Sequence, residues 1–296
     1  MEKIILFYKF TPLTDPKAIC LWQKSLASQY SLKGRVIVAT QGINGTLAGD
    51  IEDLKKYIKD TKSYPQFKRI SFKWSEGTKN DFPSLSVKVR SEIVTFGVAD
   101  KIQVSNRGIE GGGKHISPKD LDKLVKSRGD DIIFFDGRND FESSIGKFKN
   151  AVTPEVKHTR DFPKELKSKK YDAIKDKPVV TYCTGGVRCE VLTKLMKDEG
   201  FKEVYQIDGG IVKYGETFKD KGLWEGKLFV FDGRLATGFS NEAKDIGSCD
   251  ICQGKTSNYV NCADKSCNRL VLICKDCYKT TTVHCPDCTA MLANKV

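Results

Sequence analysis

The sequence predicts an α/β domain with a parallel sheet and helices on both faces, preceded by an α+β domain and followed by a small cysteine-rich tail. Two observations carry this prediction. Strands and helices alternate through the middle of the chain, as they do where helices cover a parallel sheet. Eight of the 11 cysteines follow residue 248, in four closely spaced pairs. We expect domains at 1–98, 119–222 and 249–296, with connectors at 99–118 and 223–248.

The composition is that of a globular protein with room for two or three domains. The chain has 296 residues, of which 39% are hydrophobic, and this length can bury at least one sizeable core. No apolar run is long enough to span a bilayer, and the first residues become polar too quickly for a signal peptide. We therefore expect a cytoplasmic protein with no membrane partner, in which reduced thiols disfavour disulfides.

The formal net charge of +12 suits a polyanionic partner such as RNA. The segment Lys147–Lys177 has 10 basic and 5 acidic residues, a local balance of +5. A solvated lysine face that only confers solubility explains the same excess equally well. Charge alone leaves both interpretations open.

The first 98 residues predict a ferredoxin-like split sandwich, because their elements follow the order βαββαβ. We expect helices at 15–30 and 51–62, a tight turn within Gln41–Gly45, and strands at 4–10, 35–39, 45–48, 70–74, 85–89 and 93–96. Basic and aromatic residues near the later strands suit an RNA-facing sheet. Ordinary alternation in half-buried strands explains them more simply; they are Lys68, Arg69, Phe72, Lys73, Trp74, Lys88 and Arg90.

The middle domain begins with a helix at Ser117-Pro118, since serine caps helices and proline suits a first turn. Strands and helices then alternate: we expect strands at 132–136, near Ala151, at 179–182 and at 203–207, and helices around 141–148 and at 189–199. Active sites of parallel sheets lie at the carboxyl ends of the strands. Asp136 ends one predicted strand, Arg138 lies just beyond it and Cys183 follows another, so we expect them at one edge of the sheet. His115 in the glycine-rich connector could touch substrate, but a lone histidine in a loop usually has no catalytic role.

Cys183 is the strongest candidate for a catalytic residue. It follows the apolar run 178–182 and opens a glycine-bearing loop before a predicted helix, formed by Thr184, Gly185, Gly186, Val187 and Arg188. Loop amides, the positive end of the helix and Arg188 all favour thiolate over thiol. A nucleophilic or sulfur-carrying cysteine needs this environment. The alternative is a buried cysteine beside an arginine in a salt bridge, which the Gly-Gly pair and the basic residue make less probable.

Three segments resemble rhodanese-type sulfurtransferases. The loop Cys183–Arg188 is similar to the active-site loop of that superfamily, and its four residues between cysteine and arginine match the sulfurtransferases rather than the related phosphatases. Phe134–Glu142 resembles the family's D-x-R-x-x-x-E motif, which gives Asp136 and Arg138 a supporting role. Ile207–Tyr214 resembles the closing L-x-G-G-I-x-x-Y motif.

The tail predicts a zinc-binding module. Paired thiolates at these spacings can each supply half of a tetrahedral zinc site, and the pairs are Cys249/Cys252, Cys262/Cys267, Cys274/Cys277 and Cys285/Cys288. Two zinc ions would use all eight ligands, in sequential or interleaved pairing, and His284 could replace one ligand. Disulfides, or a tail that no longer binds metal, are the alternatives. Zinc is favoured because so short a tail has too few apolar residues to fold unaided.

Across its full length the chain resembles the bacterial tRNA uridine 5-hydroxylases. The resemblance rests on Thr40–Thr46, on the loop Cys183–Glu190 and on the cysteine-rich tail. It implies oxygen-dependent conversion of the wobble uridine of tRNA to 5-hydroxyuridine, with the anticodon loop as binding partner, molecular oxygen as co-substrate and a persulfide on Cys183. The residues themselves show no two-histidine-one-carboxylate iron set and no flavin or nicotinamide motif.

Two other functions remain open at this point. A plain sulfurtransferase would move sulfur from a small donor through Cys183 to an acceptor. A non-enzymatic RNA-binding adaptor would use the first domain and the tail, with a vestigial cysteine loop. The intact loop counts against the adaptor, and the extra N-terminal domain and basic balance count against the plain sulfurtransferase.

Overall fold

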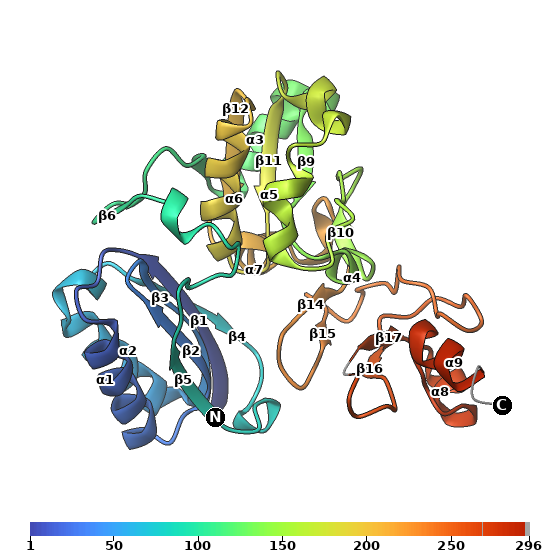
Figure 1. Cartoon of the computed structure of the whole chain (residues 1–296), viewed down its shortest axis with the longest axis horizontal. Helices are drawn as coiled ribbons and strands as arrows, with labels where there is room; N and C mark the ends of the chain where they lie inside the picture. The colour runs from blue at the N-terminus through green and yellow to red at the C-terminus, as the bar shows by residue number, and fades with distance from the viewer. Residues whose placement is uncertain (268, 294–296) are drawn as a thin grey trace. The chain divides into compact units, whose positions relative to one another are not determined.

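The computed structural model describes residues 1–267 and 269–293 (Figure 1). The chain divides into two compact units, one of residues 1–139 and 150–217 and the other of residues 140–149 and 218–296. The division cuts across the predicted middle domain, because the short segment 140–149 packs with the tail rather than with the parallel sheet. Among the described residues, no helix has the length and apolar character needed to cross a membrane.

The N-terminal sheet has the predicted ferredoxin-like arrangement. Its elements are β1 (Glu2–Phe10), α1 (Pro16–Gln29), β2 (Lys33–Ala39), β3 (Gly42–Asp50), α2 (Ile51–Ser63), β4 (Ser71–Ser75) and β5 (Leu85–Val89). The strand order β4-β1-β3-β2 is antiparallel throughout, and β5 extends the sheet in parallel with β2. Asp15 and Asp50 cap the two helices by accepting backbone N–H bonds of 2.9 and 3.0 Å.

One local prediction in this domain was wrong. The expected strand at 93–96 does not form; Ile93 and Phe96 are buried, and the Asn44 side chain donates 2.9 Å to the Ile93 carbonyl. The turn or hairpin expected at Gln41–Gly45 is confirmed: Thr40 and Gln41 form the turn that joins β2 to β3, and β3 begins at Gly42, earlier than predicted. A side chain at Gly45 would lie 2.4 Å from the Phe7 ring, so this glycine serves strand packing rather than a turn.

The second sheet is parallel, as predicted, in the order β8-β12-β11-β9. Its strands are β8 (Lys114–Ile116), β9 (Ile133–Asp136), β11 (Pro178–Tyr182) and β12 (Glu203–Ile207), with helices α3 (Pro118–Arg128), α5 (Phe162–Glu165), α6 (Val187–Asp198) and α7 (Gly210–Phe218). Figure 1 shows α6 on one side of this sheet and α3 on the other. The fully buried strand β11 explains the uninterrupted apolar run before Cys183.

Several elements lie where connectors or other elements were predicted. The connector 99–118 contains a small hairpin, β6 (Val104–Ser105) with β7 (Gly108–Ile109), and the whole of β8. The helix predicted around 141–148 ends at Ser143 as α4 (Asp140–Ser143). It is followed by β10 (Gly146–Phe148), which pairs with β13 (Trp224–Gly226). Near Ala151 only a single bridge forms, between Phe135 and Val152.

The second unit has little regular structure. The segment predicted as the connector 223–248 contributes β13, β14 (Leu228–Phe229) and β15 (Ala236–Thr237). The tail adds β16 (Tyr259–Asn261), β17 (Leu270–Leu272), α8 (Lys275–Thr280) and α9 (Pro286–Ala293). A small core forms around Ile145, Phe229, Tyr259 and Leu272. A second cluster consists mainly of cysteines, with Val271, Ile273 and Val283, so the tail has few apolar side chains to bury.

Candidate active site

Cys183 lies at the carboxyl end of β11, in the position that the sequence predicts. The residue is 0% exposed, and the backbone N–H of Gly186 donates a 3.2 Å hydrogen bond to its Sγ. Gly186 has φ +101°, a conformation that glycine adopts without steric cost. Helix α6 then begins at Val187, two residues earlier than predicted. Arg188 and Cys189 therefore lie in its first turn, beside the sulfur.

The surroundings of Cys183 favour its thiolate. Burial by itself raises the pKa of the Cys183 thiol. A hydrogen bond with Cys189, the charge of Arg188 and the backbone N–H groups of both residues outweigh burial, so the pKa is lowered overall. Burial and the neighbouring Cys183 raise the pKa of Cys189. The negative charge is thus carried by Cys183, with Cys189 as the protonated partner.

The loop Thr184–Arg188 is held from both sides. The guanidinium of Arg188, only 7% exposed, donates 3.3 Å to the Thr184 hydroxyl. Opposite, the first N–H groups of α7 donate to loop carbonyls, Ile211 to Cys183 at 3.0 Å and Val212 to Thr184 at 3.1 Å. A Cβ on Gly210 would lie 2.5 Å from the Cys183 carbonyl oxygen. The glycine pair of the motif Ile207–Tyr214 therefore allows α7 to approach the loop.

Asp136 and Arg138 lie beside the same strand end and are buried. Asp136 pairs with Tyr182 across β9 and β11. The Asp136 carboxylate accepts bonds from the Arg138 Nε at 2.9 Å and the guanidinium NH2 at 2.6 Å. The Arg138 guanidinium also lies over the Tyr182 ring, 5.7 Å from its centroid. The side chains of the pair are 1% exposed or less, and they contact the residue before Cys183.

Two residues of the N-terminal domain lie next to the cysteine loop, and the sequence analysis did not assign either of them to the site. The Tyr8 hydroxyl donates 2.9 Å to Glu190 in α6, and a Cβ on Gly186 would lie 2.9 Å from that hydroxyl. Lys73 in β4 places its Nζ 4.7 Å from the centre of the Tyr8 ring. Burial lowers the pKa of Lys73 to about 8, although the nearby Cys183 partly opposes this shift.

A charged network continues from Glu190. His115 lies 3.4 Å from Glu190 and 3.8 Å from Asp208, and hydrogen bonds with Asp208 and Glu190 raise its pKa to about 10. Asp208 also pairs with Lys213 at 3.1 Å. His115, expected in a loop, thus belongs to a strand of the sheet and lies among carboxylates near the cysteine loop. The sequence does not predict β8, because this strand is short and directly follows a glycine-rich segment.

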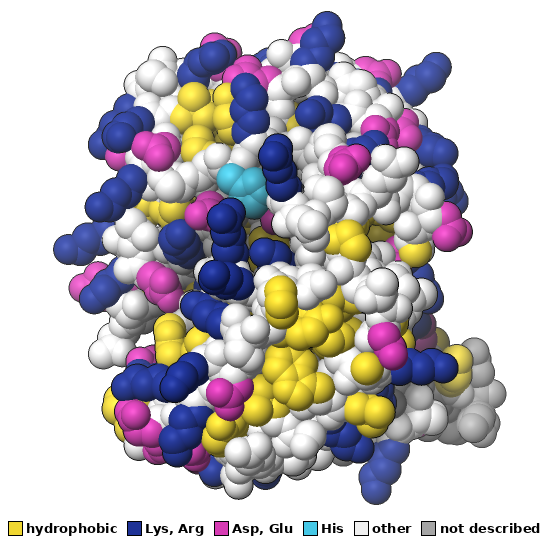
Figure 2. Space-filling view, turned by 90° about the vertical axis from the view of Figure 1, so that its left-hand side faces the viewer, with side chains coloured by type: hydrophobic (Ala, Val, Ile, Leu, Met, Phe, Trp, Pro, Cys, Tyr) yellow, Lys and Arg dark blue, Asp and Glu magenta, His cyan; other side chains and the backbone are white. Residues whose placement is uncertain are grey.

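A cleft of about 700 Å³ opens beside these residues. We call it the β4 cleft; it is lined by β1 and β4 residues, by segment 107–113, and by His115, Glu190, Asp208 and Lys213. Lys9, Arg69, Lys73 and Arg107 make its walls basic. On the face drawn in Figure 2, Lys and Arg side chains gather around a histidine.

The predicted basic segment Lys147–Lys177 is only partly available to a polyanion. Lys170 pairs with Glu165 and Lys175 pairs with Asp172. Lys164, Lys167 and Lys169 are exposed. None of the three makes an ion pair within the residues that the structure describes. The segment does not line the β4 cleft.

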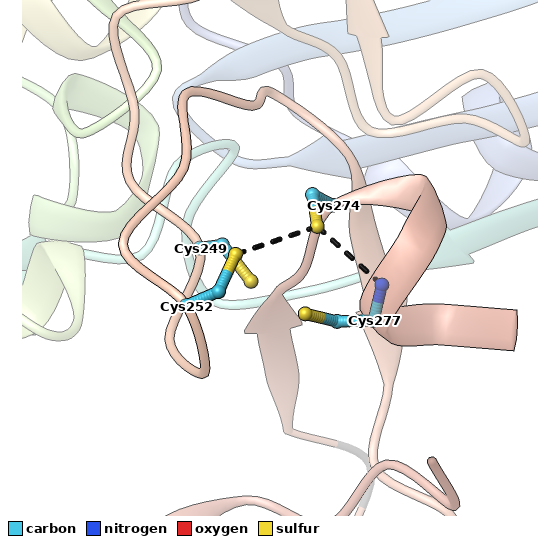
Figure 3. Close-up of side chains that lie close together, drawn as sticks. All are labelled: Cys249, Cys252, Cys274 and Cys277. Carbon is cyan, nitrogen blue, oxygen red and sulfur yellow. Dashed lines mark hydrogen bonds between the residues drawn. The ribbon is translucent and has the colours of Figure 1, made fainter. Parts of the chain in front are cut away.

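The tail brings its eight cysteines into two groups of four, and the pairing is interleaved. One group joins the first and third pairs, Cys249, Cys252, Cys274 and Cys277; the other joins the second and fourth, Cys262, Cys267, Cys285 and Cys288. Within each group the sulfur atoms lie within 4.8 Å of one another. Figure 3 shows the first group, with Cys252 Sγ 3.6 Å from Cys274 Sγ. All eight cysteines are free in the structure.

Both groups are of a kind that could hold a metal ion. Four thiolates at this separation match the ligand set of a structural tetrahedral site. Backbone N–H groups already point at the sulfurs, from Cys277 to Cys274 at 3.5 Å and from Cys285 to Cys262 at 3.3 Å. His284 belongs to neither group.

The fold and the site define a rhodanese-like domain between two smaller modules, and comparisons with known families agree. Residues 2–93 match the UPF0176 acylphosphatase-like domain, residues 117–217 the rhodanese-like domain and residues 225–289 the rhodanese C-terminal domain. The first match agrees with the ferredoxin-like sheet, and the second contains Cys183 and its loop.

Full-length relatives identify the family. A protein of Corynebacterium glutamicum (strain R) named tRNA uridine(34) hydroxylase is 54% identical over 297 residues, covering 99% of this chain and 95% of the relative. A protein of the same name from Rhodococcus opacus (strain B4) is 58% identical over 277 residues, covering 94% and 97%. One from Arthrobacter sp. (strain FB24) is 54% identical over 97% and 98%. The chain belongs to the tRNA uridine(34) hydroxylase family.

Proposed function

We propose that this protein converts the wobble uridine of tRNA to 5-hydroxyuridine, with Cys183 carrying the reacting sulfur as a persulfide. The observation that carries the proposal is the buried Cys183 whose thiolate is favoured by Arg188 and the loop N–H groups. Relatives spanning nearly the whole chain are named for hydroxylation of uridine 34 of tRNA. The substrate and the reaction come from that relationship, and the role of Cys183 comes from its surroundings.

Several residues of the site have a proposed task. Cys183 bears the sulfane sulfur, and Arg188 with the N–H groups of Gly186 and Cys189 stabilises the negative charge on it. Asp136 and Arg138 hold the strand end in position. Molecular oxygen is the proposed source of the added oxygen atom, and a small sulfur donor is the proposed source of the persulfide. The anticodon loop is the proposed tRNA segment, because a single-stranded loop can present an unstacked base.

We propose zinc for the two cysteine groups of the tail. Four thiolates form the ligand set that structural zinc prefers, and the interleaved pairs leave no sulfur unused. Zinc would supply cross-links that a tail with so few apolar side chains lacks. It would have a structural role, because neither group contains an open ligand position or a residue of the Cys183 loop.

A plain sulfurtransferase is the second candidate, favoured by the four residues between Cys183 and Arg188. The two functions differ in product. A hydroxylase leaves 5-hydroxyuridine in tRNA, whereas a sulfurtransferase only transfers sulfur to an acceptor.

The test is nucleoside mass spectrometry of tRNA from a strain that lacks the gene and carries one variant at a time. We expect 5-hydroxyuridine with wild-type protein and with Cys20→Ser, a matched cysteine in α1 outside the site. We expect none with Cys183→Ser, because serine cannot carry a persulfide. Normal levels with Cys183→Ser would contradict the role of Cys183. An unchanged tRNA in the deletion strain would leave the sulfurtransferase as the better candidate.

A further inference from the structure

We propose that the β4 cleft is the binding site for the single-stranded RNA substrate, with Lys9, Arg69 and Arg107 holding phosphates and Lys73 facing the base at Cys183. The N-terminal domain would then supply most of the recognition, and the rhodanese-like domain the sulfur. The inference rests on the proposed function, because it takes RNA as the substrate. It replaces the basic segment Lys147–Lys177 as the expected contact.

The charges of the cleft lack counterions. Lys9, Arg69 and Arg107 line it, and in the described part of the chain none of the three forms an ion pair with a carboxylate. Burial, and then the charge of Arg69, lower the pKa of Lys9, so these two cations repel each other. A phosphate between them would remove that repulsion. Such unpaired, adjacent cations are typical of sites that track a nucleic-acid backbone.

The acidic residues of the cleft do not cancel this charge. Asp208 is paired with Lys213 and lies beside His115, and Glu190 is bound by His115 and Tyr8. Only Glu216 remains in the wall as an acid for which the described residues offer no ion pair, and burial raises the pKa of its carboxyl. The net field in the cleft is therefore positive and favours an anionic ligand.

Lys73 is a residue of the cleft wall on which the charge of Cys183 acts, although Cys183 itself is not among the lining residues. It lines the cleft and lies over the Tyr8 ring, and the charge of Cys183 acts on both Lys73 and Tyr8. No described carboxylate forms an ion pair with it, so its ammonium is available as a donor. The carbonyl oxygens of uracil are acceptors, whereas cytosine presents an amino group at position 4. A lysine at this place suits a uracil base.

The size of the cleft agrees with this ligand. Small-molecule sites have volumes of roughly 300–1,000 Å³, and about 700 Å³ accommodates one nucleotide with its neighbouring phosphates. A duplex would not fit, and a base within a duplex is not accessible to a cleft. The expected occupant is therefore an unstacked nucleotide of an RNA loop.

The first experiment compares two double charge reversals with the same change in net charge. Lys9→Glu/Arg69→Glu alters the cleft, and Lys164→Glu/Lys167→Glu alters exposed lysines of the 147–177 segment. The probe is a fluorescent RNA hairpin with a seven-nucleotide loop and uridine at the wobble position. We expect the cleft variant to bind at least tenfold more weakly. We also expect its log–log salt dependence to be lower by about 1.4, the value for two lost single-strand phosphate contacts.

The matched variant distinguishes an effect of the cleft residues on RNA binding from an effect of the net charge of the protein. We expect Lys164→Glu/Lys167→Glu to weaken binding less than threefold. If this variant weakened RNA binding as much as the cleft variant or more, the inference would be overturned, and the RNA contact would lie on the 147–177 segment. A wild-type protein that binds no hairpin would instead contradict the proposed function itself. Alkylation of Cys183 and the thermal midpoint are measured in each variant. Unchanged values exclude unfolding as the cause of weaker RNA binding.

The second experiment uses the unaltered protein. A hairpin with 4-thiouridine at the wobble position is cross-linked by light, and the attached peptides are identified by mass spectrometry. We expect cross-links in peptides that contain Tyr8 or Lys73. Cross-links confined to peptides of residues 147–177 would overturn the inference.

Discussion

The Tyr8 hydroxyl in β1 donates a 2.9 Å hydrogen bond to Glu190 in the first turn of α6, joining residues 182 positions apart. Glu190 is the last residue of the motif that begins at Cys183, so the first strand of the chain contacts the motif directly. Tyr8 also lies against Gly186, whose N–H binds the sulfur. The N-terminal domain is therefore part of the environment of Cys183.

Tyr8→Phe should lower stability and activity together. It removes a hydrogen bond to a carboxylate, which costs about 1.5–3 kcal/mol, and it should raise the pKa of Glu190, which that bond helps to lower. Urea unfolding measures the change in stability, and the yield of 5-hydroxyuridine measures the change in activity. Tyr30→Phe is the matched control, because Tyr30 donates 2.6 Å to Asp60 far from the loop. Equal activity of the two variants would show that the Tyr8 contact is only structural.

Arg188→Ala should raise the pKa of Cys183. Although burial alone raises that pKa, the Arg188 charge is among the influences that lower it. In the variant the thiolate should appear only at higher pH, so alkylation of Cys183 near neutral pH should slow. Iodoacetamide labelling of the Cys183 peptide, followed by mass spectrometry across a pH series, gives the midpoint. Arg160→Ala, which removes an exposed arginine, is the control. An unchanged midpoint in Arg188→Ala would refute the electrostatic role of Arg188.

Gly210→Ala should disrupt the cysteine loop. Gly210 and Gly129 both have positive φ, +67° and +56°, and alanine in such a conformation costs about 1–3 kcal/mol. Only at Gly210 does the new Cβ also meet the loop, 2.5 Å from the Cys183 carbonyl, whereas Gly129 has open space. We expect Gly129→Ala to remain active and Gly210→Ala to lose activity and stability. Similar losses of activity and stability in both variants would indicate that backbone strain, rather than the contact with the cysteine loop, causes them.

His115→Gln should change how stability depends on pH. Hydrogen bonds with Asp208 and Glu190 raise the pKa of His115 to about 10, above the ordinary value of about 6.5. Its stabilising contribution is therefore complete below about pH 6.5 and is lost as pH rises through about 10. The difference in thermal midpoint between wild type and variant should shrink over that range. A difference that stays constant from pH 6 to 10 would contradict the charged network.

The pairing of the tail cysteines can be read from zinc content. Protein purified without chelator should contain two zinc ions per chain. Cys249→Ser/Cys274→Ser should lose one ion, because both residues belong to one group, whereas Cys249→Ser/Cys262→Ser should lose two. Sequential pairing predicts the reverse. Elemental analysis decides between them, and a wild-type protein without zinc would contradict the metal assignment.

The sequence predicted those features that depend on local pattern. The alternation of strands and helices gave the parallel sheet, and a buried apolar run before a glycine loop located Cys183. The cysteine spacings identified four pairs but not their partners, because pairing depends on the path of the chain between them. Segment 93–96 has the apolar and β-branched residues of a strand, but Ile93 and Phe96 are buried in a core without sheet pairing.

The rest depended on contacts between distant segments. Tyr8 and Lys73 reach the Cys183 loop only because β1 and β4 are neighbours in the sheet, and nothing near them in sequence signals that position. The sequence does not indicate the position of His115, because β8 is three residues long and lies between glycines and a helix start. The strand β10 was missed because its partner, β13, lies about 80 residues further on.

The interleaved cysteine groups also constrain the order of events during synthesis. The group that contains Cys249 has all its sulfurs only once Cys277 has been made, and the group that contains Cys262 waits for Cys288. Neither can be completed within the first half of the tail. A ribosome therefore finishes the N-terminal sheet and the Cys183 loop before either four-cysteine group is complete. A chain cut short before Cys277 would have neither four-cysteine group.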